Sequence, residues 1–408
     1  MNRVLPVYDV HPTSVKMLRK GHPWIIKDQF TEKFHPRDRF IVAKDRRRPF
    51  ALMIHDPRHE NIKARLWASK GDFTRLIKSF KKDVSQRIQN ALNKRKQKDF
   101  LKDRENIYLI FGEADHLPGV HVQYLGGEVL IQFYSYFWDA YSDYFIDQLL
   151  KALNHSLNLD VAKANVWTQL RADGNARKEK AKSLDPNVSF KKVEVREFGV
   201  KYQVELGKNY DCGLYTDMAS IRMSLKEDFQ KADSVLNLYS YTGAFSLFAL
   251  KQKASKVVSV DLSEKYLETL ENNIKLNQDI DRTRHESMAM SSKESLKELA
   301  AKSEKFDIIV SDPPSSSSDG NKRSNALQDY EKELPKMKEL LSEKGKIFIF
   351  LNTRKITRNK FEAKIKDIIE QKSLKLKIEK KLGLADDCPY LKGFPEGAYL
   401  KGLALVHD

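Results

Sequence analysis

Cysteine is scarce in this sequence, and long apolar runs are missing. The chain of 408 residues contains only Cys212 and Cys388, too few for a disulfide framework or a zinc cluster. It has no apolar run of about 18 residues, the length that a transmembrane helix needs. The first residues, MNRVLPVYDVHPTS, also lack the apolar core of a signal peptide. We therefore expect a cytoplasmic protein with no metal and no membrane partner.

Glycine is also scarce in the turn around which the rest of the chain is organised. Residues 232–261 predict a buried strand, a turn, a helix and a second buried strand, at Val235–Leu238, Tyr239–Gly243, Ala244–Lys251 and Lys256–Val260. This order is typical of the first half of a nucleotide-binding α/β sheet. A dinucleotide pyrophosphate needs several backbone amides that can approach it. The turn has one glycine, Gly243, so NAD is disfavoured.

Asp261 ends the second of these strands, 18 residues after Gly243. A carboxylate at this position can accept hydrogen bonds from two ribose hydroxyls. A ligand with a ribose and no pyrophosphate fits the pattern, and S-adenosylmethionine is such a ligand. The alternative is a βαβ unit with an incidental aspartate at its strand end.

Acidic residues are few in the first quarter of the chain. Residues 1–110 contain 27 Lys and Arg against 12 Asp and Glu, so they carry +15 of the net charge of +17. A basic amino-terminal part beside a nearly neutral remainder suggests a polyanion-binding module joined to an enzyme, with nucleic acid as the partner. A solvated basic surface is the alternative.

Composition and pattern predict three domains. Residues 1–75 alternate short apolar runs with turns, as in a small β-rich barrel. Residues 76–195 contain a basic helix and a central α+β domain, with a hairpin turn at Gly126-Gly127. Residues 196–408 form the catalytic α/β domain, which we expect to start with a further hairpin over 198–217.

Basic side chains near the amino terminus are the candidates for RNA contacts, namely Arg19, Lys20, Arg46, Arg47 and Arg48. The last three lie at a turn between two predicted strands, where arginines can reach phosphates. A solvated turn is the alternative. His22 and Trp24 follow Lys20 closely, and such an aromatic face is useful for stacking on RNA bases, although Trp24 can equally be a core residue.

The carboxyl-terminal half alternates strands with helices. Strands are expected at 287–290, 306–310, 347–351 and 400–406, and helices at 265–277, 325–341 and 361–370. We expect the second of these helices to kink or split at Pro335. The alternation implies a mostly parallel sheet covered on both faces, with ligands at the carboxyl ends of its strands.

Three strand ends converge at this edge. Asn237–Gly243 follows the first strand, Asp261 ends the second, and Asp312-Pro313-Pro314 follows the fourth. The two prolines remove backbone donors and stiffen the loop, which leaves carbonyl groups and Asp312 as acceptors. An acceptor cluster of this kind can hold an exocyclic amine or a base edge while a methyl group is delivered.

Several segments together resemble one family, the class I methyltransferases that modify large-subunit ribosomal RNA. The resemblance covers nearly the whole chain and rests on HPWII, GEADHLPGVHVQY, NYDCGLYTDMASIRMSL, VLNLYSYTGAFSLFAL, FDIIVSDPPS and FPEGAYLKGLAL. It implies a PUA-like RNA-binding domain at 1–75, a central α+β domain and a Rossmann-like catalytic domain. S-adenosylmethionine is the cofactor that it implies, and RNA is the partner.

The resemblance also implies roles for residues near the strand ends. The cofactor would contact Tyr215, Asp217, Arg222, Asn237, Tyr239, Thr242, Gly243, Asp261, Ser291 and Asp312. Asp261 would hold the ribose hydroxyls, and Asp312 with Pro313 and Pro314 would face the methyl group. Asp217 can also cap the helix that follows it.

The residue after the strand at 347–351 departs from one branch of the family. Members that methylate carbon 5 of cytosine carry a Cys there, whose thiolate first adds to carbon 6. Here the position is Asn352, which cannot form that adduct. A second branch methylates guanine N7 and has an Asn-rich basic stretch, which LNTRKITR resembles. The N7 lone pair attacks directly, so orientation supplies most of the catalysis. Guanine N7 is the preferred target, with Asn352 in the site, and cytosine C5 with a displaced nucleophile, Cys388, is the alternative.

Two further positions depart from both branches. Relatives have an aromatic ring two residues after the second proline, where it can stack on a flipped base; here that residue is Ser316, and Tyr215, Tyr330 or Tyr390 are candidates to replace it. Relatives also have an acid after the third strand to meet the adenine amine, and this chain has Ser291. These departures motivate a third hypothesis, an RNA-binding or assembly protein that has lost turnover. The oligomeric state stays open, with a homodimer as one option.

Overall fold

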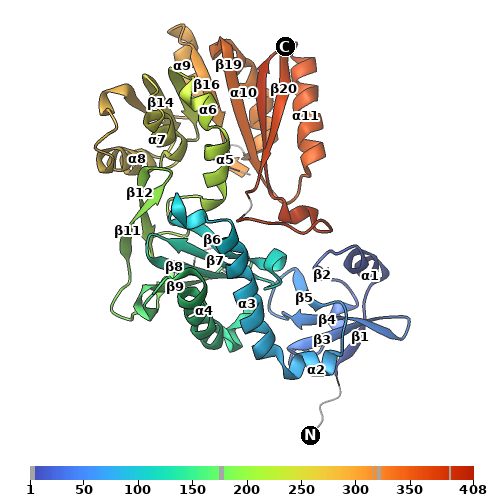
Figure 1. The fold of residues 1–408 in the computed structure, drawn as a ribbon. Coiled ribbons are helices and arrows are strands. Elements are labelled where there is room, and N and C mark those ends of the chain that lie inside the picture. The colour runs from blue at the N-terminus through green and yellow to red at the C-terminus, as the bar shows by residue number, and fades with distance from the viewer. Residues whose placement is uncertain (1–4, 174–178, 315, 319–322, 386) are drawn as a thin grey trace. The chain divides into compact units, whose positions relative to one another are not determined.

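The computed structural model describes residues 5–173, 179–314, 316–318, 323–385 and 387–408 (Figure 1). The chain forms two units: one comprises Met1–Val193, Glu205–Cys212 and Asp386–Phe394, and the other comprises Glu194–Val204, Gly213–Ala385 and Pro395–Asp408. The expected boundary at residue 195 lies close to a boundary between the units, whereas the one at residue 75 lies inside the first unit. The division into three domains stays a prediction.

Alternating apolar residues build the β-rich start of the first unit. Its sheet has the order β1-β3-β4-β5-β2, with β1 at Val7–Asp9, β2 at Trp24–Ile26, β3 at Phe40–Asp45, β4 at Arg48–His55 and β5 at Ile62–Ala68. Ile41 and Met53 pack in the core beside helix α1 (Pro12–Arg19), whereas Val42 and Leu52 point to the opposite face and join the core of the central part. The predicted β-rich start is confirmed, and its PUA-like character stays a prediction.

The central part of the first unit is a second sheet with two helices against it. Its order is β10-β9-β8-β7-β6, with β6 at Asn106–Phe111, β7 at Val120–Leu125, β8 at Glu128–Phe133, β9 at Val166–Leu170 and β10 at Lys182–Ser183. Helices α3 (Phe80–Gln97) and α4 (Ser142–Leu157) lie side by side (Figure 1) and share one apolar core with these strands. The predicted turn at Gly126-Gly127 joins β7 to β8. The basic helix is confirmed as α3, preceded by the separate short helix α2 (Phe73–Lys78).

The hairpin expected over 198–217 begins earlier in the chain than the sequence suggested. Strands β11 (Lys191–Glu197) and β12 (Val200–Leu206) form a two-stranded sheet, and their turn is Phe198–Gly199. Both turn residues have positive φ, 52° and 81°, a conformation that glycine adopts freely. In β11 the buried residues Val193 and Val195 alternate with exposed ones. This two-residue period marks the first strand of the hairpin.

The second unit contains a seven-stranded sheet. Its order is β15-β14-β13-β16-β19-β21-β20, with β13 at Ser234–Leu238, β14 at Lys256–Asp261, β15 at His285–Ala289, β16 at Phe306–Ser311, β19 at Leu341–Asn352, β20 at Leu376–Gly383 and β21 at Leu400–His407. All pairs are parallel except those that β21 makes with β19 and β20. The mostly parallel sheet is confirmed. A further short hairpin joins β17 (Ser316–Ser318) to β18 (Arg323–Asn325).

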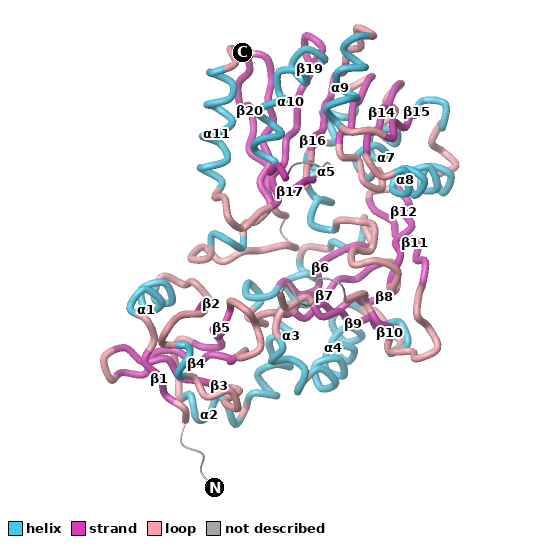
Figure 2. Tube along the Cα trace, turned by 180° about the vertical axis from the view of Figure 1, so that it is seen from behind, coloured by secondary structure: helices cyan, strands magenta, loops and turns pink. Residues whose placement is uncertain are grey.

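Helices cover both faces of this sheet (Figure 2). They are α5 at Ala219–Ser224, α6 at Lys226–Gln230, α7 at Ala244–Lys251, α8 at Glu264–Leu276, α9 at Ser292–Ala301, α10 at Ala326–Leu340 and α11 at Arg358–Gln371. In β19, Ile347 and Ile349 pack with apolar residues of α9, α10 and α11. Phe348, between them, stacks with Phe229 of α6 on the other face, at 6.2 Å between ring centroids. A strand buried on both faces is apolar at every position, as the run IFIFL shows.

Helix α10 continues through Pro335 as a single element. Proline removes one backbone donor from a helix interior, which is why a split was expected there. The apolar face of α10 keeps the helix in place, since Leu334 and Met337 on either side of the proline are fully buried. The expected split is therefore wrong.

Candidate active site

Three strand ends meet at the carboxyl edge of the seven-stranded sheet. Strand β13 pairs in parallel with β14 and with β16, and Leu238 lies opposite both Val260 and Ser311. The next residues after these partners are Asp261 and Asp312. The turn after β13 and the two aspartates therefore lie along one edge, as the sequence predicted.

The turn after β13 has an unusual backbone. Tyr239 and Tyr241 have φ values of 56° and 51°, a left-handed conformation that costs a side-chain-bearing residue about 1 kcal/mol. Gly243 has φ of 84°, and a Cβ atom there would lie 2.3 Å from Leu270 Cγ of α8. The single glycine is thus required for the close approach of α8. Strained backbone of this kind occurs at ligand sites.

Asp261 holds this turn in place. Its Oδ2 atom accepts a hydrogen bond of 2.9 Å from the Tyr241 amide, and its Oδ1 atom accepts one of 2.9 Å from the Ser263 amide. Each carboxylate oxygen can accept two hydrogen bonds. Both oxygens therefore keep an acceptor position while their orientation is fixed. Thr242, in the same turn, donates a hydrogen bond to the Gly213 carbonyl.

Asp312 is close enough to Asp217 to feel its charge. Burial, and then the negative charge of Asp217, raise the pKa of Asp312 to about 7. Asp217 is itself buried, and its Oδ2 accepts a hydrogen bond of 2.6 Å from the Tyr399 hydroxyl. The two carboxyl groups are thus within range of each other's charge, and near neutral pH a proton resides on Asp312 for part of the time. Pro313 is buried beside Asp312, and Pro314 is exposed.

A second acidic group lies beneath the turn and was missed by the sequence reasoning. The Tyr239 hydroxyl donates to Glu333 Oε1 at 2.9 Å, and Ser292 donates to the same oxygen. Burial raises the pKa of Glu333 to about 6. The signal for this residue is its position in α10, where it shares the apolar face with Tyr330 and Met337. A glutamate on the buried face of an amphipathic helix needs a partner.

Tyr330 is a structural residue and not an exposed ring. It is fully buried, and its hydroxyl oxygen lies 2.9 Å from the Ser311 carbonyl and 2.7 Å from the Phe350 carbonyl. It also accepts the Phe350 amide at 3.0 Å. Tyr330 therefore ties the end of β16 to β19, and the suggestion that it replaces the missing stacking aromatic is wrong.

Tyr215 is exposed and lies against the turn. Its ring centroid is 5.2 Å from that of Tyr241, which in turn is 4.6 Å from that of Tyr266. Tyr215 is 44% exposed. Its placement suits both the predicted contact with the cofactor and the stacking role. Tyr390, the other candidate for stacking, is exposed in the first unit.

Two residues assigned to the cofactor are engaged in buried networks. The Arg222 guanidinium donates to both carboxylate oxygens of Glu197, each at 2.7 Å, and both side chains are buried. Asn237 donates to Ser246 Oγ at 2.8 Å from within the sheet. These contacts support helix α5 and the strand that leads into the turn. Direct contact of either residue with the cofactor stays a prediction.

Ser291 caps helix α9. Its hydroxyl accepts the Glu294 amide at 3.3 Å, and its own amide donates to Glu294 Oε2 at 3.3 Å, which makes a capping box. The acid closest to this cap is thus Glu294, three residues beyond Ser291. The role of Ser291 toward the adenine stays a prediction.

Asn352 ends β19, opposite Leu400 of β21, and is exposed. The loop after it carries the exposed cations Arg354 and Lys355. Cys388 is fully buried and belongs to the first unit. A nucleophile must reach its substrate, so this burial does not favour the displaced-cysteine alternative.

The basic residues proposed for RNA contacts gather at the β3–β4 turn. Arg46 and Arg47 form the turn with φ of 52° and 93°, and both are exposed, as is Arg48. Arg19, at the end of α1, donates to Asp45 at 2.7 Å, the residue before the turn. Lys20 follows Arg19 and is exposed. Four arginines thus share one small surface, which we call the arginine turn.

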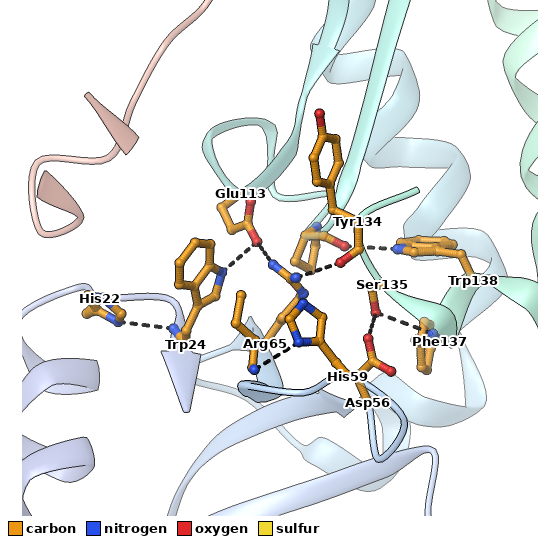
Figure 3. Close-up of polar contacts among 12 residues, drawn as sticks. His22, Trp24, Asp56, His59, Arg65, Glu113, Tyr134, Ser135, Phe137 and Trp138 are labelled. Carbon is orange, nitrogen blue, oxygen red and sulfur yellow. Dashed lines mark hydrogen bonds and ion pairs between the residues drawn. The ribbon is translucent and has the colours of Figure 1, made fainter. Parts of the chain in front are cut away.

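Trp24 has a structural partner inside the first unit (Figure 3). Its indole donates to Glu113 Oε1 at 2.7 Å, and Arg65 donates to the same oxygen at 2.7 Å. Arg65 is buried and also donates to the Tyr134 carbonyl at 2.7 Å. The charge of Arg65 holds the pKa of Glu113 below its usual value, although burial acts in the opposite direction. This network joins the β-rich part to the central part, which explains why they form one unit.

The described part of the chain contains neither a cluster of metal ligands nor a membrane-spanning helix. There, no three His, Cys, Asp or Glu residues lie together in a way that could hold a metal ion. None of the helices in the same residues is both long and apolar enough to span a membrane.

Comparison with known proteins identifies the family to which the chain belongs. The family of S-adenosylmethionine-dependent methyltransferases matches residues 142–379, which is more than half of the chain. The chain belongs to this family. It is therefore an enzyme with S-adenosylmethionine as its cofactor, as the turn and Asp261 suggested.

Similar proteins extend over nearly the whole chain. Ribosomal RNA large subunit methyltransferase I of Escherichia coli (strain E24377A) is 27% identical over 95% of this chain and 96% of its own. YwbD of Bacillus subtilis (strain 168), a candidate ribosomal RNA large subunit methyltransferase, is 28% identical over 74% of this chain and 75% of its own.

Two solved structures share the fold. A candidate S-adenosylmethionine-dependent methyltransferase from Streptococcus mutans has a TM-score of 0.81 at 20% identity and covers 98% of this chain and 100% of its own. The structure of SMU.776 complexed with SAH has a TM-score of 0.82 at 20% identity over the same shares. The class I methyltransferase fold, with a β-rich amino-terminal part, is thereby confirmed.

Proposed function

We propose that this enzyme methylates large-subunit ribosomal RNA, and that its target atom is guanine N7. The relative from Escherichia coli, whose name carries that substrate, aligns over nearly the full length of both chains. The first unit adds exposed basic side chains to the methyltransferase fold, as an RNA substrate requires. We therefore extend the substrate class of these relatives to this chain.

The presence of Asn352 at this position is the observation that favours guanine N7 as the target atom. It is exposed at the end of β19, where a cytosine-C5 enzyme of this family would need a thiolate. Both cysteines lie elsewhere, and Cys388 is fully buried. Guanine N7 needs no covalent adduct, because its lone pair is available in the plane of the ring. The residues present thus suit direct transfer.

The chemistry proposed is a single displacement. S-adenosylmethionine supplies an electrophilic methyl group on a sulfonium. In such a transfer the N7 lone pair would form the new N–C bond as the S–C bond broke, so the positive charge would pass from sulfur to the guanine ring and no proton would need to be removed. Asp261 would hold the ribose, and the turn at Tyr239–Gly243 would hold the remainder of the cofactor. The carboxyl groups of Asp312 and Asp217 would stabilise the positive charge on the ring.

The arginine turn would contact RNA phosphates. A two-residue hairpin turn with both φ values positive ordinarily uses Asn and Gly, whereas this one uses Arg46 and Arg47 at a conformational cost. Such a cost is consistent with a functional requirement for the two side chains. Arg19 and Arg48 enlarge the same positive surface.

Methyl labelling tests both the substrate and the atom. The protein is incubated with tritium-labelled S-adenosylmethionine and ribosomal RNA from a strain that lacks its gene, and the digested nucleosides are separated. We expect label in 7-methylguanosine, and equal label with a Cys388→Ser variant. Label only in 5-methylcytidine would overturn the choice of atom. Label in no nucleoside, together with normal cofactor binding, would overturn the RNA substrate and favour an assembly protein without turnover.

A further inference from the structure

Lys401 is a buried lysine at the carboxyl edge of the second unit's sheet. It lies in β21, between β19 and β20, opposite Leu351 and Gly383. Only 2% of the residue is exposed. Its ammonium group donates to the Tyr399 carbonyl at 2.8 Å and also to the Thr353 carbonyl. A buried cation is costly unless its donors are satisfied, and here backbone carbonyls satisfy two of the three.

The two carbonyls belong to separate segments at the edge. Thr353 is the first residue after β19, and Tyr399 is the last before β21. The Thr353 amide also donates to the Tyr399 carbonyl at 3.0 Å. Lys401 therefore fastens the loop after β19 to the entry of β21. This loop starts at Thr353, directly after Asn352, and carries Arg354.

The side chain of Tyr399 extends the connection to the candidate catalytic groups. Its hydroxyl donates to Asp217 Oδ2 at 2.6 Å, and the charge of Asp217 contributes to the raised pKa of Asp312. Contacts thus run from Lys401 through Tyr399 to Asp217. The loop after β19 and the carboxyl pair share this one support.

No carboxylate neutralises Lys401 within ion-pair distance among the residues that the structure describes. The charged group that faces it is Arg358 of α11, which has the same sign. From the neighbouring strands it faces Leu351 and Gly383, which do not titrate. Burial and Arg358 together lower the pKa of Lys401 to about 8. A lysine kept in so unfavourable a place, at the edge that binds the cofactor, suggests a functional role.

We propose that Lys401 is a positioning residue for methyl transfer. Its ammonium holds the loop after β19 and, through Tyr399, the Asp217 carboxylate in the arrangement that presents the RNA base to the methyl group. This inference rests on the proposed function. It adds a residue that lies outside the set expected from the sequence, although the segment FPEGAYLKGLAL contains it.

The test compares Lys401→Met, which keeps the length of the side chain without its charge, with Lys401→Arg, which keeps the charge. Lys377→Met, on the exposed part of β20, is the matched control. Methyl transfer to RNA is measured in single turnovers between pH 6 and 10, and cofactor affinity by calorimetry. We expect Lys401→Met to lower the transfer rate about 10- to 100-fold, with cofactor affinity changed less than about 3-fold. The control should match the wild type.

The pH profile separates positioning from simple stability. The wild-type rate should fall on the alkaline side with a midpoint near 8, as Lys401 loses its proton. Lys401→Arg should restore the rate and remove this fall, because a guanidinium stays charged. If Lys401→Arg folds poorly, amide hydrogen exchange is compared between Lys401→Met and the wild type. Faster exchange in Lys401→Met that is confined to residues 352–357 and 213–218 supports the proposal. Unchanged exchange in these residues overturns it. A Lys401→Met enzyme with the wild-type rate and alkaline fall also overturns it. An inactive wild type instead overturns the proposed function.

Discussion

Arg222 and Glu197 form a buried ion pair in which two hydrogen bonds of 2.7 Å join the guanidinium to both carboxylate oxygens. Glu197 ends β11, and Arg222 lies in α5, within the segment NYDCGLYTDMASIRMSL that carries part of the family resemblance. The pair fastens this segment to the β11–β12 hairpin. Because both groups are buried and paired, we expect a change to either residue to lower the stability of the protein first.

Arg222→Met should destabilise the protein by about 3–5 kcal/mol, because it leaves the Glu197 carboxylate buried without its partner. The double variant Arg222→Met with Glu197→Leu should recover most of that loss, since no charge stays buried. Denaturant unfolding of the two variants measures the difference. If the double variant is no more stable than the single one, the ion pair is not what Arg222 contributes.

Gly243→Ala should destabilise the second unit by about 2–4 kcal/mol, through a left-handed backbone and the contact with Leu270. Gly127→Ala is the matched control, since Gly127 also has positive φ, 97°, but has no atom within 4 Å of an added Cβ. The control should lose only about 1 kcal/mol, the conformational part. Thermal unfolding compares them. Equal losses would show that the close approach of α8 does not require glycine at position 243.

Asp312 should make the protein less stable as pH rises. Its folded pKa is about 7 and its usual value is 3.8, so the folded state binds more protons than the unfolded state between those values. The contribution of Asp312 to stability is therefore lost as pH rises from 4 through 7. Asp312→Asn should be more stable than the wild type at pH 8, by on the order of 4 kcal/mol, and similar to it at pH 4. A stability difference that does not change with pH would contradict the raised pKa.

Arg46→Asn with Arg47→Gly should separate stability from RNA binding. These residues suit a turn with two positive φ values, so the free energy of unfolding should rise by up to about 1 kcal/mol. The loss of two phosphate contacts should lower the slope of log affinity against log salt by about 1.4 for single-stranded RNA. Lys293→Gln with Lys297→Gln on α9 is the control for lost charge. If the arginine variant binds RNA as tightly as the lysine control, the arginine turn is not part of the RNA site.

Much of the catalytic sheet could be predicted because its strands are short apolar runs that end in turn residues. Val235–Leu238 and Phe306–Val310 lie within the core of the sheet, and residues of the candidate site follow directly after these strands. Parallel pairing then brings Asp261 and Asp312 to one edge without further information. Strand β20 lacked this signal, since it is an edge strand with four charged residues among its eight, LKIEKKLG.

Contacts between distant residues could not be predicted in the same way. Tyr239 and Glu333 are 94 residues apart, and Tyr399 and Asp217 are 182 apart. No spacing rule connects such pairs, because tertiary packing brings them together. A weaker signal marks some of the buried polar residues, namely their position on an otherwise apolar face. Glu333 in α10 and Lys401 in β21 both have that signature.

Asp261 carries the central claim, that the adenosyl ribose is held at the carboxyl edge of the sheet. Asp261→Asn keeps the size of the side chain but loses the charge and one acceptor. Calorimetric titration with S-adenosylmethionine should therefore show an affinity about 10- to 100-fold below that of the wild type. Asp279→Asn, which removes a surface acid paired with Lys251, should bind like the wild type. Wild-type affinity in Asp261→Asn would contradict the account.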